Sequence, residues 1–104
     1  MSFDIDKTIG DMLSAASDVI SGDWPHVKDC IEQAFKAEKD ALKEIAEARI
    51  DGLIDDDDMK SQLEDEKVAL EAALLACRVR AKIMAQNAIN AAINVFKEAI
   101  SLAL

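Results

Sequence analysis

The segment ARIDGLIDDDDMK, residues 48–60, contains the end of one helix and the beginning of the next. Gly52 stands where a helix ends in a left-handed residue, and the apolar Leu53 is then expected to pack back on the last turn. Asp55 has the side chain of an N-cap, and the three aspartates after it complement the helix dipole. The aspartate run lacks the central glycine and the glutamate of a calcium-binding EF-hand loop. The segment therefore predicts the turn of an antiparallel helical hairpin.

Helical patterns extend from this turn in both directions. Upstream, apolar residues at spacings of three and four predict a helix over about 23–50, with Pro25 in its first turn. A shorter amphipathic helix is predicted over about 4–20. Downstream there is no further glycine or proline, which predicts one uninterrupted helix over about 56–104. We therefore expect an all-α fold, a long antiparallel helical hairpin plus a short N-terminal helix, assembling into an oligomeric helical bundle.

Length and charge limit the classes of protein to consider. The chain has 104 residues, which predicts a single helical domain over 1–104. Its net charge of −9 repels phosphate backbones and anionic lipid, so we expect neither a nucleic-acid partner nor a membrane. Aspartates in the first twenty residues argue against a secretory signal. The prediction is a cytoplasmic, acidic protein whose two cysteines are reduced thiols.

Residues 83–104 predict self-association. Their polar side chains form one stripe, which consists of Asn87, Asn90, Asn94, Lys97 and Ser101. The rest of this segment is apolar over two adjacent faces, and one neighbouring helix does not cover both. We expect a second copy to cover the face formed by Ile89, Ile93, Phe96 and Ile100. A homo-oligomer follows, most simply a dimer. The asparagine stripe is either a solvated face or a polar layer at that interface.

One group of residues has side chains suited to metal or redox chemistry. His26 precedes Cys30 by one helical turn, and Cys77 falls at the level of Cys30 if the hairpin turns near residue 53. Together they are candidates for zinc ligands or for a redox-active thiol pair. The competing interpretation is that both cysteines are small residues at the seam of the hairpin, because helix axes about 8–10 Å apart seldom allow a disulfide. Whether the two sulfur atoms are close enough depends on the tertiary structure.

Two glutamates near the apolar stripes raise a second enzyme hypothesis. Glu38 and Glu66 are placed as carboxylates of a di-iron site would be in a helical bundle. Such a site also needs Glu-x-x-His motifs, and the sequence contains none. A salt bridge from Glu38 to Lys67 explains the placement of Glu38 without a metal.

The remaining inventory favours a protein without enzymatic activity. The chain has one histidine and no tyrosine, and it contains no glycine-rich phosphate loop or Ser/His/Asp set. We therefore expect no cofactor and no catalytic residues. The leading hypothesis is a structural or protein-interaction module that acts as a scaffold, adaptor or chaperone-like subunit. One alternative is a small metal-binding or thiol-redox protein, and the other is a subunit of a hetero-oligomeric complex with a different protein partner.

Overall fold

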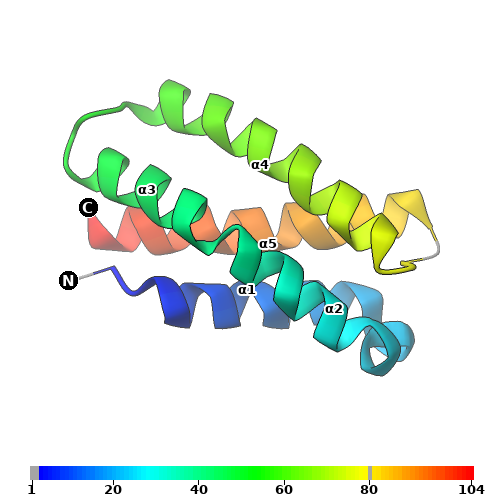
Figure 1. Ribbon diagram of the computed structural model, residues 1–104. Helices are drawn as coiled ribbons and strands as arrows, with labels where there is room; N and C mark the ends of the chain where they lie inside the picture. Colours follow the sequence, from blue (N-terminus) through cyan, green and yellow to red (C-terminus); the bar gives the residue numbers. More distant parts are fainter. Residues whose placement is uncertain (1–2, 80) are drawn as a thin grey trace.

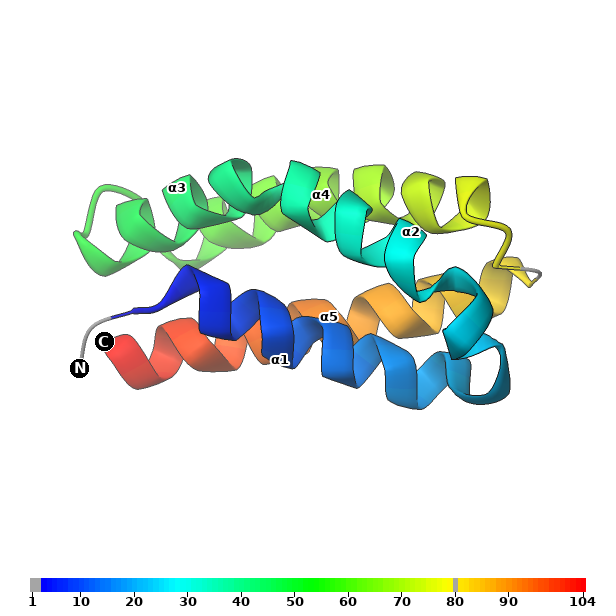
Figure 2. The ribbon, with the colours of Figure 1, turned by 60° about the horizontal axis from the view of Figure 1, so that its bottom comes forward.

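The computed structural model describes residues 3–79 and 81–104 of the chain. In these residues the order of elements is α1 (Ile5–Ile20), a short 3-10 helix η1 (Ser21–Asp23), α2 (Trp24–Ala37), α3 (Lys39–Ile50), α4 (Asp56–Ala76) and α5 (Lys82–Ala103). They form an elongated bundle of 39 × 23 × 19 Å. Figures 1 and 2 show that α1 and α4 run in one direction, whereas α2, α3 and α5 run in the other. The prediction of an all-α helical bundle is confirmed.

The N-terminal half follows the predicted pattern with one added break. Asp4 caps α1, because its Oδ1 accepts a hydrogen bond from the backbone N–H of Lys7 at 3.1 Å. The predicted helix over about 23–50 is interrupted at Glu38, where the backbone N–H of Glu38 donates to the carbonyl of Phe35 at 3.2 Å. This is the tighter hydrogen bond of a 3-10 turn. The chain then continues as α3 in the same general direction (Figure 1).

The turn between α3 and α4 has the predicted chemistry. Gly52 adopts φ +77°, and the N–H of Leu53 donates to the carbonyl of Ala48 at 2.8 Å, as in a Schellman helix end. The expectation that Leu53 packs back on the helix is wrong, since 78% of its surface is exposed. The partly buried Ile54 packs against the core instead.

The start of α4 is a reciprocal cap. The Oδ1 of Asp55 accepts from the N–H of Asp58 at 2.8 Å, and the Oδ2 of Asp58 accepts from the N–H of Asp55 at 3.2 Å. The first of these hydrogen bonds is the main cause of a lowered pKa of Asp55. Arg49 donates to Asp56 across the turn at 2.8 Å. The aspartates therefore have the predicted role in starting the helix.

The predicted single helix over about 56–104 is wrong. α4 ends at Ala76 and α5 begins at Lys82, and the chain reverses between them (Figure 1). The reversal is a second Schellman end, in which the N–H of Val79 donates to the carbonyl of Leu74 at 3.2 Å. Its left-handed residue is Arg78, with φ +68°. A non-glycine residue in this conformation costs about 1–2 kcal/mol.

Burial of α5 outweighs that local cost. After the reversal, α5 contacts α1, α3 and α4. Its buried residues are Ala85, Ala88, Ile89, Ala92, Ile93, Phe96 and Ile100. Burying one large aliphatic or aromatic side chain contributes about 1.5–3 kcal/mol. The free energy gained by burying a few such side chains therefore exceeds the cost of the left-handed conformation at Arg78. Local sequence favours a continuous helix here, but tertiary packing favours the turn.

The apolar face assigned to an interface is part of the core of a single chain. The exposed fractions of Ile89, Ile93, Phe96 and Ile100 are 0%, 2%, 0% and 1%. Phe3 packs edge-on against Phe96, with 6.1 Å between the ring centroids. The sequence-based expectation of an uncovered face rested on the long third helix, which would have left α5 with one neighbour. A second copy is not required to cover these side chains.

Candidate functional site

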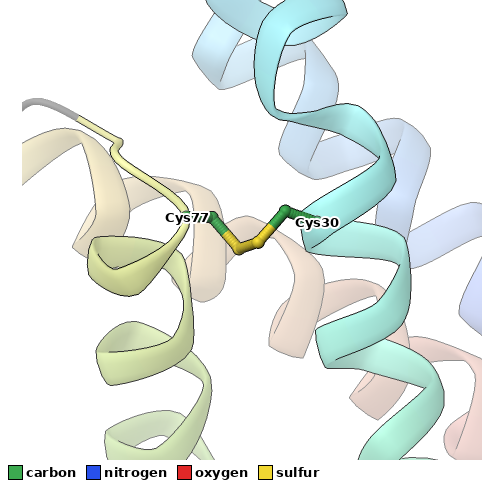
Figure 3. The surroundings of a disulfide bond; sticks show 2 residues. All are labelled: Cys30 and Cys77. Carbon is green, nitrogen blue, oxygen red and sulfur yellow. A yellow bond between two sulfur atoms is a disulfide. The ribbon is translucent and has the colours of Figure 1, made fainter.

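A disulfide joins Cys30 on α2 to Cys77 at the end of α4 (Figure 3). The Cα atoms are 5.7 Å apart and the residues are separated by 47 positions in the sequence. The prediction that Cys30 and Cys77 lie at the same level of the hairpin is therefore confirmed. The prediction that both are reduced thiols is wrong for this structure.

The helix break explains the close approach of the two cysteines. The sequence placed Cys77 inside a long helix, and two helices at ordinary spacing keep such residues apart. In the structure Cys77 is the C-cap of α4, where the chain is already leaving the helix. Cys77 can therefore approach α2 to within disulfide distance. Sequence reasoning missed this bond because it missed the end of α4.

The two half-cystines differ in exposure. Cys30 is exposed, whereas only 8% of the Cys77 surface is accessible. Beside Cys77 lies a surface hollow of about 330 Å³, lined by Asp23, His26, Val27, Cys77 and Arg78. The structure thus brings His26, Cys30 and Cys77 to one end of the bundle, as the hairpin register predicted.

The oxidised cysteines do not fit the proposed zinc set. A zinc site would use the two sulfur atoms as thiolates, and here they are bonded to each other. Among residues 3–79 and 81–104, no three His, Cys, Asp or Glu side chains are grouped closely enough to hold a metal ion. Of the two chemistries that the sequence suggested for this group, the structure favours the thiol pair.

The second cluster that the sequence suggested consists of the carboxyl groups of Glu38 and Glu66. The predicted salt bridge from Glu38 to Lys67 is not among the ion pairs of the described residues. Lys67 pairs with Glu64 at 3.6 Å, and Glu38 lies within hydrogen-bonding reach of Glu66. The Oε2 atom of Glu66 is buried and has no hydrogen-bond partner among the described residues. Burial, followed by the hydrogen bond and the charge of Glu38, raises the pKa of Glu66 to about 7. The pair therefore holds a proton near neutral pH.

A third feature is an exposed apolar surface on α4. The residues that form it are Val68, Ala69, Ala72, Leu75 and Ala76; we call them the α4 face. The exposed fractions of Val68 and Leu75 are 69% and 42%. The sequence does indicate an apolar surface in this segment, because Glu71 is the one charged residue between positions 68 and 76. It was overlooked because residues 83–104 have a longer apolar run.

Charges of opposite sign lie at the two ends of the α4 face. Glu64 and Asp65 are exposed on its N-terminal side, and Arg78 and Lys82 are exposed beyond its C-terminal side. None of these four side chains except Glu64 takes part in an ion pair among the described residues. An antiparallel copy of the same surface would bring each acidic end against a basic end.

No family model, no curated protein and no solved structure matches the chain. No helix in the described part of the chain is long and apolar enough to cross a membrane.

Proposed function

We propose that this chain is a non-enzymatic protein-interaction module that associates with a second copy of itself through the α4 face. The observation that carries the proposal is the exposure of Val68 and Leu75 on a face otherwise made of alanines. Alanines allow two helices to approach closely, and the large side chains then pack against the opposite helix. The core is complete within one chain, so association adds to a folded monomer rather than completing it.

A two-fold axis near Ala72 gives the simplest arrangement. In an antiparallel pair of α4 helices, Val68 of one copy lies opposite Leu75 of the second copy. The same register brings Asp65 to the C-terminal end of the second copy's α4, beyond which Arg78 lies. Because the interface is self-complementary, each of these contacts occurs twice. The opposite charges favour this orientation over a parallel pair, in which like charges would meet.

The size of the α4 face predicts a weak dimer. Partial burial of four Val and Leu side chains contributes about 4–8 kcal/mol. Association itself costs about 4–15 kcal/mol in lost translational and rotational freedom. The most favourable balance of these two contributions, about 4 kcal/mol in favour of association, corresponds to a Kd of about 1 mM. Such an affinity suits a reversible scaffold or adaptor better than a permanent complex.

Other features support the same class of function. The net charge of −9 disfavours nucleic acid and anionic membrane surfaces as partners. A cytoplasmic location remains our prediction. A subunit of a hetero-oligomeric complex is the alternative, in which a different protein covers the α4 face.

Sedimentation velocity tests the proposal over protein concentrations from about 10 μM to about 2 mM, which bracket the expected Kd. We expect the weight-average sedimentation coefficient to rise with concentration. Val68→Glu should abolish that rise, because it buries a charge against the second copy. Leu102→Glu is the matched control, since Leu102 is similarly exposed, at 66%, but lies on α5. A wild-type chain that stays monomeric throughout would reject self-association.

Charge exchange tests the orientation. Asp65→Lys should weaken the dimer, because two like charges then meet at each end of the interface. Arg78→Asp should weaken it in the same way, and the double variant should restore wild-type association. If the double variant is no better than the single variants, Asp65 and Arg78 do not face each other and the antiparallel register is wrong.

A further inference from the structure

We propose that the Cys30–Cys77 disulfide is a redox-active modification site, which exchanges with an external thiolate at the sulfur atom of Cys30. The bridge joins α2 to the end of α4 (Figure 3). Cys30 is exposed, and Cys77 is buried with an accessible surface of 8%. The more exposed residue, Cys30, is therefore the target that we assign to the attacking thiolate, and Cys77 is then the leaving group. This inference goes beyond the association of α4 and does not depend on it.

The exchange is balanced with two equivalents of a thiol reductant. The first thiolate attacks Sγ of Cys30, the Cys30–Cys77 bond breaks, and Cys77 leaves as a thiolate with the bonding electron pair. A second thiolate attacks the reductant sulfur of the mixed disulfide, and Cys30 leaves in turn. The two reductant thiols are oxidised to one disulfide, and the protons that they release end on Cys30 and Cys77.

Arg78 is a group near Cys77 that can stabilise it as a departing thiolate. Cys77 lines the hollow together with His26 and with Arg78, a cationic residue. A positive charge beside a sulfur atom stabilises the thiolate, and a more stable thiolate leaves faster. Asp23 lines the same hollow with the opposite charge. Arg78 directly follows Cys77 in the chain, so we assign it the role of a positioning residue for the leaving group.

The fold links this bond to the reversal of the chain. Cys77 ends α4, and Arg78 holds the left-handed conformation that starts the turn into α5. Between Cys77 and Lys82 the sequence has no glycine or proline to favour a turn. Cleavage of the disulfide removes the covalent restraint on the residue at which this turn begins. Reduction therefore removes a restraint at a turn that tertiary packing favours, although the local sequence favours a continuous helix.

Reduced glutathione is the probe for the exchange. The oxidised wild-type protein is incubated with it in native buffer, quenched with acid, and mapped by peptide mass spectrometry. We expect a mixed disulfide on Cys30 and a free thiol on Cys77, formed at a rate proportional to glutathione concentration. A disulfide that opens only with global unfolding would react at a rate independent of glutathione at high concentration, and this result would overturn the proposal. A mixed disulfide on Cys77 would also overturn it.

Variants at Arg78 test the positioning role. Arg78→Gln should slow the exchange by about three- to tenfold, since a nearby charge typically changes a thiol pKa and its leaving ability by that order. Arg78→Lys keeps the positive charge and should retain most of the rate. Lys60→Gln removes one positive charge from an exposed site elsewhere on α4 and should leave the rate unchanged. Equal rates for Arg78→Gln and Arg78→Lys would remove Arg78 from the mechanism.

Discussion

Gly52 and Arg78 occupy the same position in two helix ends of one chain. Each is the left-handed residue after the C-cap, with φ +77° for Gly52 and +68° for Arg78. Each end also has the same long hydrogen bond, from Leu53 to Ala48 at 2.8 Å and from Val79 to Leu74 at 3.2 Å. Glycine adopts this conformation without steric strain, whereas arginine does not. The protein thus contains one relaxed and one strained version of the same turn.

Arg78→Gly should therefore stabilise the protein. We expect the free energy of unfolding to rise by about 1 kcal/mol, because the strain at this position disappears. Gly52→Ala is the reciprocal change and should lower the free energy of unfolding by about 1 kcal/mol. No atom lies within 4 Å of a Cβ built on Gly52, so any loss there reflects backbone conformation. Urea denaturation of both variants measures these effects, and a destabilised Arg78→Gly variant would show that the arginine side chain has a stabilising role.

The disulfide should be a major contribution to stability. A cross-link between residues 47 positions apart restricts the unfolded chain by ~4 kcal/mol in the chain-entropy model. Cys30→Ser combined with Cys77→Ser should lower the free energy of unfolding by up to that amount. Denaturation of the wild type with dithiothreitol should give a similar value. If the double variant and the oxidised wild type unfold at the same urea concentration, the bond does not restrict the unfolded chain as expected.

The carboxyl group of Glu66 should make stability depend on pH. Its pKa is raised from 4.5 to about 7, first by burial and then by the hydrogen bond with Glu38. The native state therefore binds this proton more tightly than the unfolded state, and the free energy of unfolding should fall as the pH rises from about 4.5 to about 7. Partial exposure of the side chain limits the effect to about 1 kcal/mol.

Glu66→Gln tests this assignment, because glutamine occupies similar space and does not ionise. The variant should gain stability over wild type above pH 7 and lose the decline between pH 4.5 and 7. Glu98→Gln, at an exposed position on α5, is the control and should keep the wild-type profile. Thermal denaturation at a series of pH values measures both. A wild-type profile in Glu66→Gln would mean that another group causes the dependence.

Substitution of Phe96 tests whether the apolar face of α5 belongs to the core of one chain or to an interface between copies. Phe96 is fully buried within one chain, so Phe96→Ala should lower the free energy of unfolding by about 3–5 kcal/mol. Because the contacts are intramolecular, the loss should be the same at every protein concentration. Leu102→Ala, at an exposed position of the same helix, should change the free energy of unfolding by less than about 0.5 kcal/mol. A loss for Phe96→Ala that depends on concentration would return this face to an oligomer interface.

Local sequence was sufficient for most of the helices. Gly52 and the aspartates that follow it specify the turn from α3 to α4, because the chemistry that ends and starts a helix lies within a few residues. Apolar residues that recur every three or four positions located the helical segments of α1, α2 and α3, because this pattern is also local. The common level of Cys30 and Cys77 followed from the position of that turn. The break at Glu38 has no comparable signal, and the sequence did not predict it.

The turn at Arg78 was decided by tertiary structure alone. Residues 77–81 contain no helix-breaking residue, so local propensity favours one long helix through them. The reversal forms because it places α5 against α1, α3 and α4, and the free energy of burying its apolar face exceeds about 1–2 kcal/mol of strain at Arg78. That turn also moved Cys77 to a helix end, joined it to Cys30, buried the expected interface and left the α4 face exposed. These consequences arise from contacts between residues distant in the sequence, which a local pattern does not contain.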